Sequence, residues 1–377
     1  MHPTDVNATG QGYTLALALH RLHIPSIIYE ARSRYYNPGG GLMLSPNALR
    51  ALDSLGAYKR LLDKALHFDK LYFKNAKNET TDIYYFGSRT IYGYPAMRMM
   101  RKELLDKLLV MLRERNIPVF FDSAMATVDY DRPDLDTKAH PTYAGILGIS
   151  CVVQRSQLRI PDNYGLPAIA MGKPGGFLLI PQEPKNQMAL RSISGRSDCS
   201  QNKHKLYNTI HKNQTDWPDI VQSALEAIPP DIMGFWAFYG LAPLSSWLSE
   251  SKRVIYIGDV AHAIRPTVSQ GDNQAIEDAC SLASLLSKPS PAVHLEEAAA
   301  LWQSYRQERI RKILDLTQQM NAKRLPEAEK AKLPPNAIWT DSSLMRGEGG
   351  ELRWLYDPDM SVEAEKWAQE LTVKGSA

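Results

Sequence analysis

The first apolar segments of the chain predict a helix followed by a strand. Tyr13 to Leu22 is a strongly apolar run of good helix formers, and His23-Ile24-Pro25 ends it. The short β-branched run from Ser26 to Tyr29 then predicts a strand, which Glu30 closes. A helix, a tight turn, a strand and an acid in this order are typical of the second half of a βαβ unit.

The middle of the chain follows a different pattern from its two ends. Between Tyr143 and Trp247, short apolar runs alternate with Gly and Pro, which predicts an antiparallel sheet. Outside this region the pattern predicts helices at 47–55, 104–115, 273–286 and 295–320, and strands at 119–121 and 254–257. The sequence therefore predicts an α/β fold in which a parallel domain is interrupted by an antiparallel sheet.

Composition narrows the class of protein. The chain has 377 residues, which favours two packed domains, and its net charge of +3 gives no reason to expect nucleic acid but is compatible with an anionic ligand. The cysteines Cys151, Cys199 and Cys280 are odd in number and widely spaced, which argues against a disulfide framework or a metal site and favours a reducing, cytoplasmic compartment. No apolar run reaches the roughly 18 residues of a membrane span.

The strongest pattern is the run from Val254 to Ala279, VIYIGDVAHAIRPTVSQGDNQAIEDA. Its apolar start predicts a buried strand that ends at Gly258, where a ligand can approach closely. Asp259 follows at the carboxyl end of that strand, where open α/β sheets bind ligands. A proline-containing loop then enters a helix through 270–273, and free N–H groups at a helix start can hold an electron-rich carbonyl. The run therefore predicts a ligand site.

This run resembles the segment G-D-A-A-H-x-x-x-P-x-x-G-Q-G-x-N-x-A-x-E-D-A of FAD-dependent aromatic hydroxylases, a class of flavoprotein monooxygenases, of the salicylate hydroxylase-like type known from fungal secondary metabolism. The resemblance implies a Rossmann-like FAD-binding domain with an inserted antiparallel substrate-binding sheet. It assigns Asp259 to the flavin ribityl hydroxyls and the backbone of Gly271 and Asp272 to the flavin ring. The alternative is a strand, loop and helix with a capping Asp.

The resemblance also implies further cofactor contacts and a division into domains. Glu30 matches the acid that binds the adenosine ribose, Arg101 matches an Arg-x-x-Leu that contacts the ribityl or phosphate region, and Gly40 and Gly41 lie in a glycine-rich loop that approaches the cofactor. For each, the alternative is an ordinary surface or turn residue. The implied FAD-binding part is 1–71, 95–140 and 248–322, the substrate-binding part is 72–94 and 141–247, and 323–377 is a C-terminal tail.

The nucleotide-binding beginning departs from the family pattern. The fingerprint G-x-G-x-x-G corresponds here to Asn7 through Gly12, and only Gly12 is in register. The polar residues 1–6 lack the continuous apolar character of a central parallel strand. A strand ending in Asp-Gly, which in the family touches the pyrophosphate, is replaced by the run from Val128 to His140. Both departures concern the pyrophosphate cradle, so we expect FAD binding to be weak relative to intact relatives.

The motif itself and the substrate sheet also depart from the family. Val268 and Ser269 stand where small glycines are usual, and Asp272 stands where a small neutral residue is usual. Beside a flavin carbonyl, the Asp272 carboxylate would disfavour an anionic reduced ring. The alternative is that it points to solvent and caps the helix. By alignment, Ser150 and Ile180 stand where some fungal phenol hydroxylases have a catalytic Arg and Tyr.

Other polar residues are weaker candidates for a catalytic role. Arg191 and Tyr239 are loose candidates for the substrate pocket, with packing as the alternative for each. His262 has no partner acid or nucleophile at a suggestive spacing, so we expect it to be structural. No catalytic residue follows from the sequence.

The resemblance leaves three functional hypotheses. The first is an FAD-dependent monooxygenase that uses NAD(P)H and hydroxylates or epoxidises an aromatic or polyketide-like molecule. The second is a descendant of that fold with weak or no FAD binding, acting as a cofactor-free isomerase, cyclase or hydrolase. The third is an inactive protein. Fold alone does not choose among them.

Overall fold

A computed structural model describes the chain from residue 9 to residue 374, except for residues 38, 125–141, 183–185, 195–206, 209, 230–232, 241–243, 288–294 and 341–349. The first two residues of the predicted fingerprint, Asn7 and Ala8, and the whole run from Val128 to His140 lie outside the described residues. In the described part, no helix is both long and apolar enough to cross a membrane.

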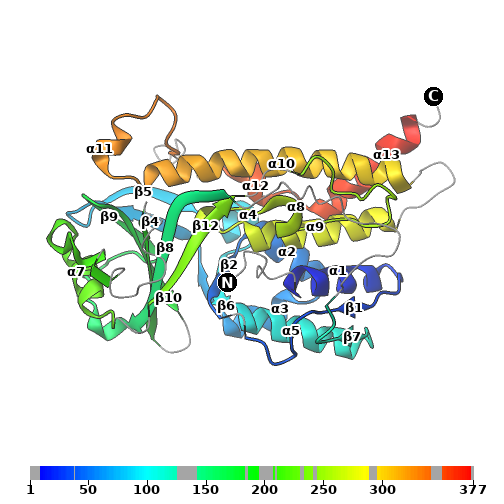
Figure 1. Cartoon of the computed structure of the whole chain (residues 1–377), viewed down its shortest axis with the longest axis horizontal. Coiled ribbons are helices and arrows are strands. Elements are labelled where there is room, and N and C mark those ends of the chain that lie inside the picture. The colour runs from blue at the N-terminus through cyan, green and yellow to red at the C-terminus, as the bar shows by residue number, and fades with distance from the viewer. Residues whose placement is uncertain are drawn as a thin grey trace.

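A mixed seven-stranded sheet forms one end of the molecule (Figure 1). Helix α7, Asp219–Glu226, covers one face and buries Ile220 and Leu225 against it. The prediction of an antiparallel sheet is correct for the strands after residue 141, but β4 and β9 pair in parallel. The reason is that β4 and β5 come from an earlier part of the chain and join the edge of the sheet as a separate hairpin. In spatial order, the strands are β12 (Gly234–Gly240), β8 (Thr142–Gln154), β11 (Gln187–Ser194), β10 (Gly175–Gln182), β9 (Ala168–Gly172), β4 (Lys70–Lys74) and β5 (Thr80–Tyr85).

The opposite end of the molecule is mainly helical (Figure 1). Its central element is α9, Gly271–Leu286, in which every residue from Asn273 to Leu285 is buried. Helices on several sides of α9 contact it: α1, Thr9–Arg21; α2, Pro46–Ser54; α10, Leu295–Lys323; and α13, Met360–Lys374. The remaining helices are α3 (Tyr58–Leu61), α4 (Arg89–Tyr92), α5 (Arg101–Glu114), α8 (Asp259–His262), α11 (Glu327–Lys330) and α12 (Arg353–Tyr356).

Two small sheets accompany these helices. Strands β2 (Gly41–Leu44), β6 (Ala96–Met100) and β3 (Leu66–Phe68) form a three-stranded antiparallel sheet. Strands β1 (Ile28–Tyr29) and β7 (Val119–Phe120) form a parallel pair, as the βαβ pattern predicts. The fold is therefore α/β, as expected. Among the described residues, its parallel sheet consists of the short β1–β7 pair.

The predicted strand at 254–257 is wrong. Only Ile255 forms a bridge, antiparallel to Leu248. The segment instead bonds to the loop before it, because Tyr256 N–H donates to the Trp247 carbonyl at 2.8 Å and the Val254 carbonyl accepts from Ser249 N–H at 3.0 Å. An apolar run becomes a ladder strand only where a neighbouring strand pairs with it, and no described strand lies alongside this one.

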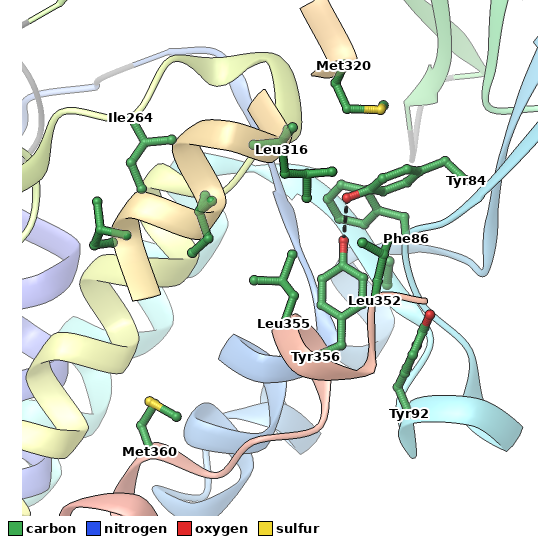
Figure 2. Close-up of a cluster of buried hydrophobic side chains, with 14 of the residues drawn as sticks. Tyr84, Phe86, Tyr92, Ile264, Leu316, Met320, Leu352, Leu355, Tyr356 and Met360 are labelled. Atoms are coloured by element: carbon green, nitrogen blue, oxygen red, sulfur yellow. Dashed lines mark hydrogen bonds between the residues drawn. The ribbon is translucent and has the colours of Figure 1, made fainter. Parts of the chain in front are cut away.

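The segment after residue 323 contributes to the largest hydrophobic core. Figure 2 shows Leu352, Leu355 and Tyr356 packed against side chains from early strands and from α10. The hydroxyl groups of Tyr84 and Tyr356 lie 2.9 Å apart, and both rings are buried. Helix α13 adds buried Trp367 to this core.

Candidate active site

The turn at Gly258 and Asp259 lies at the centre of the candidate site. Gly258 has φ 64° and ψ −141°, a backbone conformation that residues with a Cβ atom strongly disfavour. Its carbonyl accepts from the N–H groups of Ala261 and His262 at 2.9 and 2.8 Å, which starts α8. The glycine therefore allows the chain to turn sharply and to place Asp259 at the first position of this short helix.

The carboxyl group of Asp259 is partly buried and has no hydrogen-bond donor among the described residues. Burial, with a smaller contribution from the Asp272 carboxylate, raises its pKa to about 6, and His262 and Arg101 partly offset that rise. A Cβ atom added to Gly271 would lie 3.7 Å from Asp259 Oδ1. Asp259 is therefore an acceptor without a partner beside the N-terminus of α9.

A second group of predicted residues meets at the same place. Arg101 Nη1 lies 3.2 Å from Asp272 Oδ1, and the side chains are 17% and 36% exposed. The backbone N–H of Arg101 donates to the Gly40 carbonyl at 3.1 Å. The Asp272 carboxylate thus lies beside a guanidinium in the first turn of α9, an arrangement that the sequence did not predict. These contacts join Arg101, Asp272 and Gly40 into one cluster with Asp259 and Gly271.

The glycine loop before β2 leaves space above its backbone. Gly39 and Gly40 have φ of 62° and 66°, and a Cβ atom added to either would meet no heavy atom within 4 Å. Gly12 near the start of α1 is equally open. At Gly41 the opposite holds, because the Arg98 guanidinium lies where a Cβ would be. Gly41 therefore borders a cation, whereas the other three glycines border open space.

Glu30 lies at the end of β1. Its backbone N–H continues the pairing with β7 by donating to the Phe120 carbonyl at 2.8 Å, and its side chain accepts from the N–H of Arg32 at 2.9 Å. The Glu30 charge also reaches Tyr13 in α1, where burial first and this carboxylate second raise the phenol pKa to about 12. Two residues earlier in α1, Gln11 contacts the Gly258 turn. Glu30 and the turn before Asp259 are therefore both linked to the first turns of α1.

Comparison with known proteins identifies the family. Residues 132–320 match the family model described as FAD binding domain. The chain belongs to this family. Its relatives include salicylate hydroxylase of Pseudomonas putida, 25% identical over 73% of this chain and 74% of the relative, and hispidin-3-hydroxylase of Neonothopanus nambi, 25% identical over 79% of this chain and 83% of the relative. The crystal structure of CtdE in complex with FAD and a substrate has the same fold, with a TM-score of 0.74 and 18% identity over 98% of each chain.

The resemblance to aromatic-hydroxylase-type flavoprotein monooxygenases is thus confirmed, as are the predicted α/β class, the enzyme class and the FAD cofactor. The residues present fit an FAD molecule. Asp259 offers an acceptor that lacks a donor among the described residues, and the backbones of Gly12, Gly39 and Gly40 border open space. Hydroxyl groups of a cofactor would supply the missing donors, and the open space beside these glycines leaves room for its phosphates.

A buried ion network behind the FAD-family turn was not found from the sequence. Asp278 Oδ2 accepts from Gly258 N–H at 2.9 Å and lies 2.5 Å from His262 Nε2. Asp278 Oδ1 accepts from Arg306 Nε at 2.7 Å, and Arg306 also pairs with Glu277 at 2.7 Å. Electrostatic interactions and hydrogen bonds with His262 and Arg306 hold the pKa of Asp278 well below its usual range despite complete burial.

His262 thus has an acid partner in Asp278, in a buried contact of the structural kind expected for this residue. The pair is separated by sixteen residues in sequence, a spacing that carries no signal until α8 and α9 are placed together. The adjacent acids Glu277 and Asp278 on a helix with an otherwise apolar character are the signal that sequence reasoning could have used, because buried carboxylates require basic partners.

The weaker substrate-site candidates lie on the seven-stranded sheet. Arg191 belongs to β11, opposite Ser150 of β8 and Leu178 of β10, and its side chain lies outside the described residues. Tyr239 of β12 is 45% exposed, and its ring packs edge-on against Tyr143 with centroids 5.8 Å apart. Neither position is brought into contact with the Gly258 turn by a described side-chain interaction.

The residues aligned with the catalytic pair of fungal phenol hydroxylases differ in their surroundings. Ser150 is exposed, whereas Ile180 is 5% exposed. Neither side chain has an acid or base function at neutral pH.

Proposed function

We propose that this flavoprotein monooxygenase hydroxylates or epoxidises an aromatic or polyketide-like small molecule, with NAD(P)H as the reductant of its FAD. The observation that carries the proposal is the convergence of Asp259, Gly271, Asp272, Arg101 and Gly40 on one side of the helical part. When bound, FAD supplies the redox chemistry with oxygen, and the protein binds and orients the reactants.

Each residue of this cluster has a proposed role. The ionised Asp259 carboxylate accepts hydrogen bonds from ribityl hydroxyls, and the N-terminal backbone of α9 at Gly271 and Asp272 faces the flavin ring. Arg101 neutralises the Asp272 carboxylate and offers its remaining donors to the ribityl or phosphate region. Gly40 and Gly41 line the approach of the cofactor, and Glu30 accepts from the adenosine ribose.

The substrate is proposed to lie between this cluster and the seven-stranded sheet. The two regions lie close together: Arg98 Nη2 donates to Gln182 Oε1 at 3.3 Å, and the Arg265 guanidinium lies near Gly240, 3.7 Å from where a Cβ atom would be. Met100, which precedes Arg101, also receives the Gln182 amide at its sulfur at 2.7 Å. A substrate held here would be enclosed by apolar strands and by the cofactor, which shields the reacting atoms from water.

The proposed domain division follows the same arrangement. The FAD-binding part is 1–71, 95–140 and 248–322, the substrate-binding part is 72–94 and 141–247, and 323–377 forms a C-terminal segment. The early segment 72–94 is assigned to the substrate-binding part although it lies far from the rest of that part in sequence. Strands β4 and β5 support this assignment, because both belong to the seven-stranded sheet.

The visible spectrum of the purified protein before and after extensive dialysis tests the proposal. We expect a yellow protein whose flavin is lost more readily than in relatives with an intact fingerprint, and which regains its colour when FAD is added. Oxygen uptake with NADPH should then increase on addition of a phenolic substrate. A colourless protein that binds no added FAD, yet converts such a substrate, would show a flavin-independent enzyme instead.

A further inference from the structure

We propose that Gln11 is a positioning residue of the FAD site, because its side chain clamps the Gly258–Asp259 turn to the start of α1. The inference rests on the cofactor-binding role proposed above for Asp259. It concerns a glutamine that lies in the first turn of α1, 246 residues before the carbonyl that it contacts.

The contact is specific in its geometry. Gln11 Nε2 donates to the Ile257 carbonyl at 3.1 Å, and the contact is partly buried. The next residue, Gly258, has a positive φ, and a Cβ atom added there would collide with the Gln11 amide group. The amide therefore lies directly against the α-carbon of Gly258. Both the hydrogen bond and the close approach define where the turn sits relative to α1.

The Ile257 carbonyl needs this donor because its segment is not part of a described strand ladder. Tyr256 and Val254 direct their backbone bonds toward the loop at 247–249, which satisfies that edge of the segment. On the other edge of the segment, the donor to the Ile257 carbonyl among the described residues is the Gln11 side-chain amide. A rotatable side chain thus does what a neighbouring backbone strand does in a parallel sheet.

The turn is held differently on its α9 side. Gly258 N–H donates to Asp278, and Asp278 is fixed by the buried Arg306. If Gln11 is removed, this anchor stays, so the turn remains folded but is free to pivot about the Gly258 nitrogen. Because Asp259 is the next residue, such a pivot would move its carboxylate relative to Gly271. A positioning defect without a folding defect is the expected signature.

The test compares Gln11→Met, which keeps the length of the side chain but has no donor, with Gln11→Glu, whose carboxylate at pH 8 keeps the shape and also lacks a donor. Gln318→Met is the matched control, because Gln318 is exposed on α10. Two quantities are measured in each protein: amide hydrogen exchange of residues 258–262 without FAD, and the dissociation constant of FAD from the change in flavin fluorescence.

We expect both Gln11 variants to show faster exchange at the turn and weaker FAD binding, each by roughly 2- to 10-fold, as one lost hydrogen bond implies. The control and the melting temperature should stay at wild-type values. Unchanged exchange and affinity in Gln11→Met, with FAD bound by the wild type, overturn the inference and leave the proposed function intact. A general rise of exchange throughout α1 and α9 with a lower melting temperature also overturns it, since Gln11 would then only stabilise the fold.

The exchange measurement keeps this inference separate from the proposed function. If the wild type binds no FAD, the proposed function fails and the claim that Gln11 serves an FAD site fails with it. Faster exchange confined to the turn in the Gln11 variants still establishes the clamp in that case, because this measurement uses flavin-free protein.

Discussion

Replacing Asp259 by Asn should change stability and FAD affinity in opposite directions. Burial raises the pKa of Asp259 from 3.8 to about 6. In the folded protein without ligand, the ionised carboxylate therefore lowers the free energy of unfolding. The shift of about 2 units corresponds to at most about 3 kcal/mol at roughly 1.36 kcal/mol per unit, and partial solvent exposure of the side chain makes the real value smaller. Asp259→Asn removes this cost and should stabilise the flavin-free protein at pH 7.

The sign of the pH dependence follows from the raised pKa. Between pH 4 and pH 6 the folded state binds more protons at Asp259 than the unfolded state, so rising pH lowers the stability of the wild type there. Above pH 6 the full cost is present, and below pH 4 it is absent. The gain from Asp259→Asn should therefore be close to zero at pH 4 and should reach its maximum above pH 6.

FAD affinity should respond in the other direction. Hydrogen bonds from ribityl hydroxyls to an ionised carboxylate contribute about 1.5–3 kcal/mol, so Asp259→Asn should weaken binding by roughly 10- to 150-fold above pH 6. Binding to the wild type should also weaken as the pH falls below about 6, because protonation removes the charged acceptor. The variant should show no such dependence.

Urea unfolding of the flavin-free proteins and fluorescence titration with FAD, both from pH 4 to pH 8, measure these effects. Asp53→Asn is a suitable control, because this acid bonds to the Tyr94 hydroxyl away from the candidate site. Equal FAD affinity in wild type and Asp259→Asn at pH 7.5 would refute the assignment of Asp259 to the cofactor. A loss of stability at pH 7 would refute the reasoning on its buried charge.

Three further predictions concern other parts of the molecule. Arg306→Met should lower the free energy of unfolding by about 3–5 kcal/mol, because it removes the buried cation that Glu277 and Asp278 share, and a change below 1 kcal/mol in urea unfolding would contradict this. Asp272→Asn removes a charge that raises the pKa of Asp259, so the pH midpoint of FAD affinity should fall, and a rise would speak against the proximity of the two acids. Tyr84→Phe should cost about 1–3 kcal/mol by isolating the Tyr356 hydroxyl, whereas the double replacement by Phe should cost less than the sum of the single ones in a double-mutant cycle.

Local patterns were sufficient to predict much of the fold. The predicted helix at Tyr13–Leu22 and the strand after it are present as α1 and β1. Such elements can be predicted locally because the spacing of apolar residues follows the geometry of the element that buries them. The predicted strand at 254–257 failed because an apolar run is necessary for a central strand but a paired neighbour is required as well. The parallel pairing of β4 with β9 joins segments almost a hundred residues apart, and no local pattern encodes such a pair.

The candidate site shows the same division between local and distant information. Asp259, Gly271 and Asp272 were predicted together because they lie in one contiguous motif, and Arg101 and Gly40 were added by their order along the chain. Gln11 and Arg306 were missed. Glutamine and arginine are ordinary surface residues in most helices, and only the packing of α1 and α10 against the motif reveals their contacts.

The aromatic pair at Tyr84 and Tyr356 has a consequence for how the protein is made. A ribosome adds Tyr84 long before Tyr356, because 272 residues separate them. Until α12 emerges, the early strands expose the rings that it later covers, so a nascent chain presents an apolar surface to chaperones while the intervening residues are made. Completion of this core therefore waits until Tyr356 has left the ribosome, and premature stop codons upstream of Tyr356 should yield chains marked for degradation.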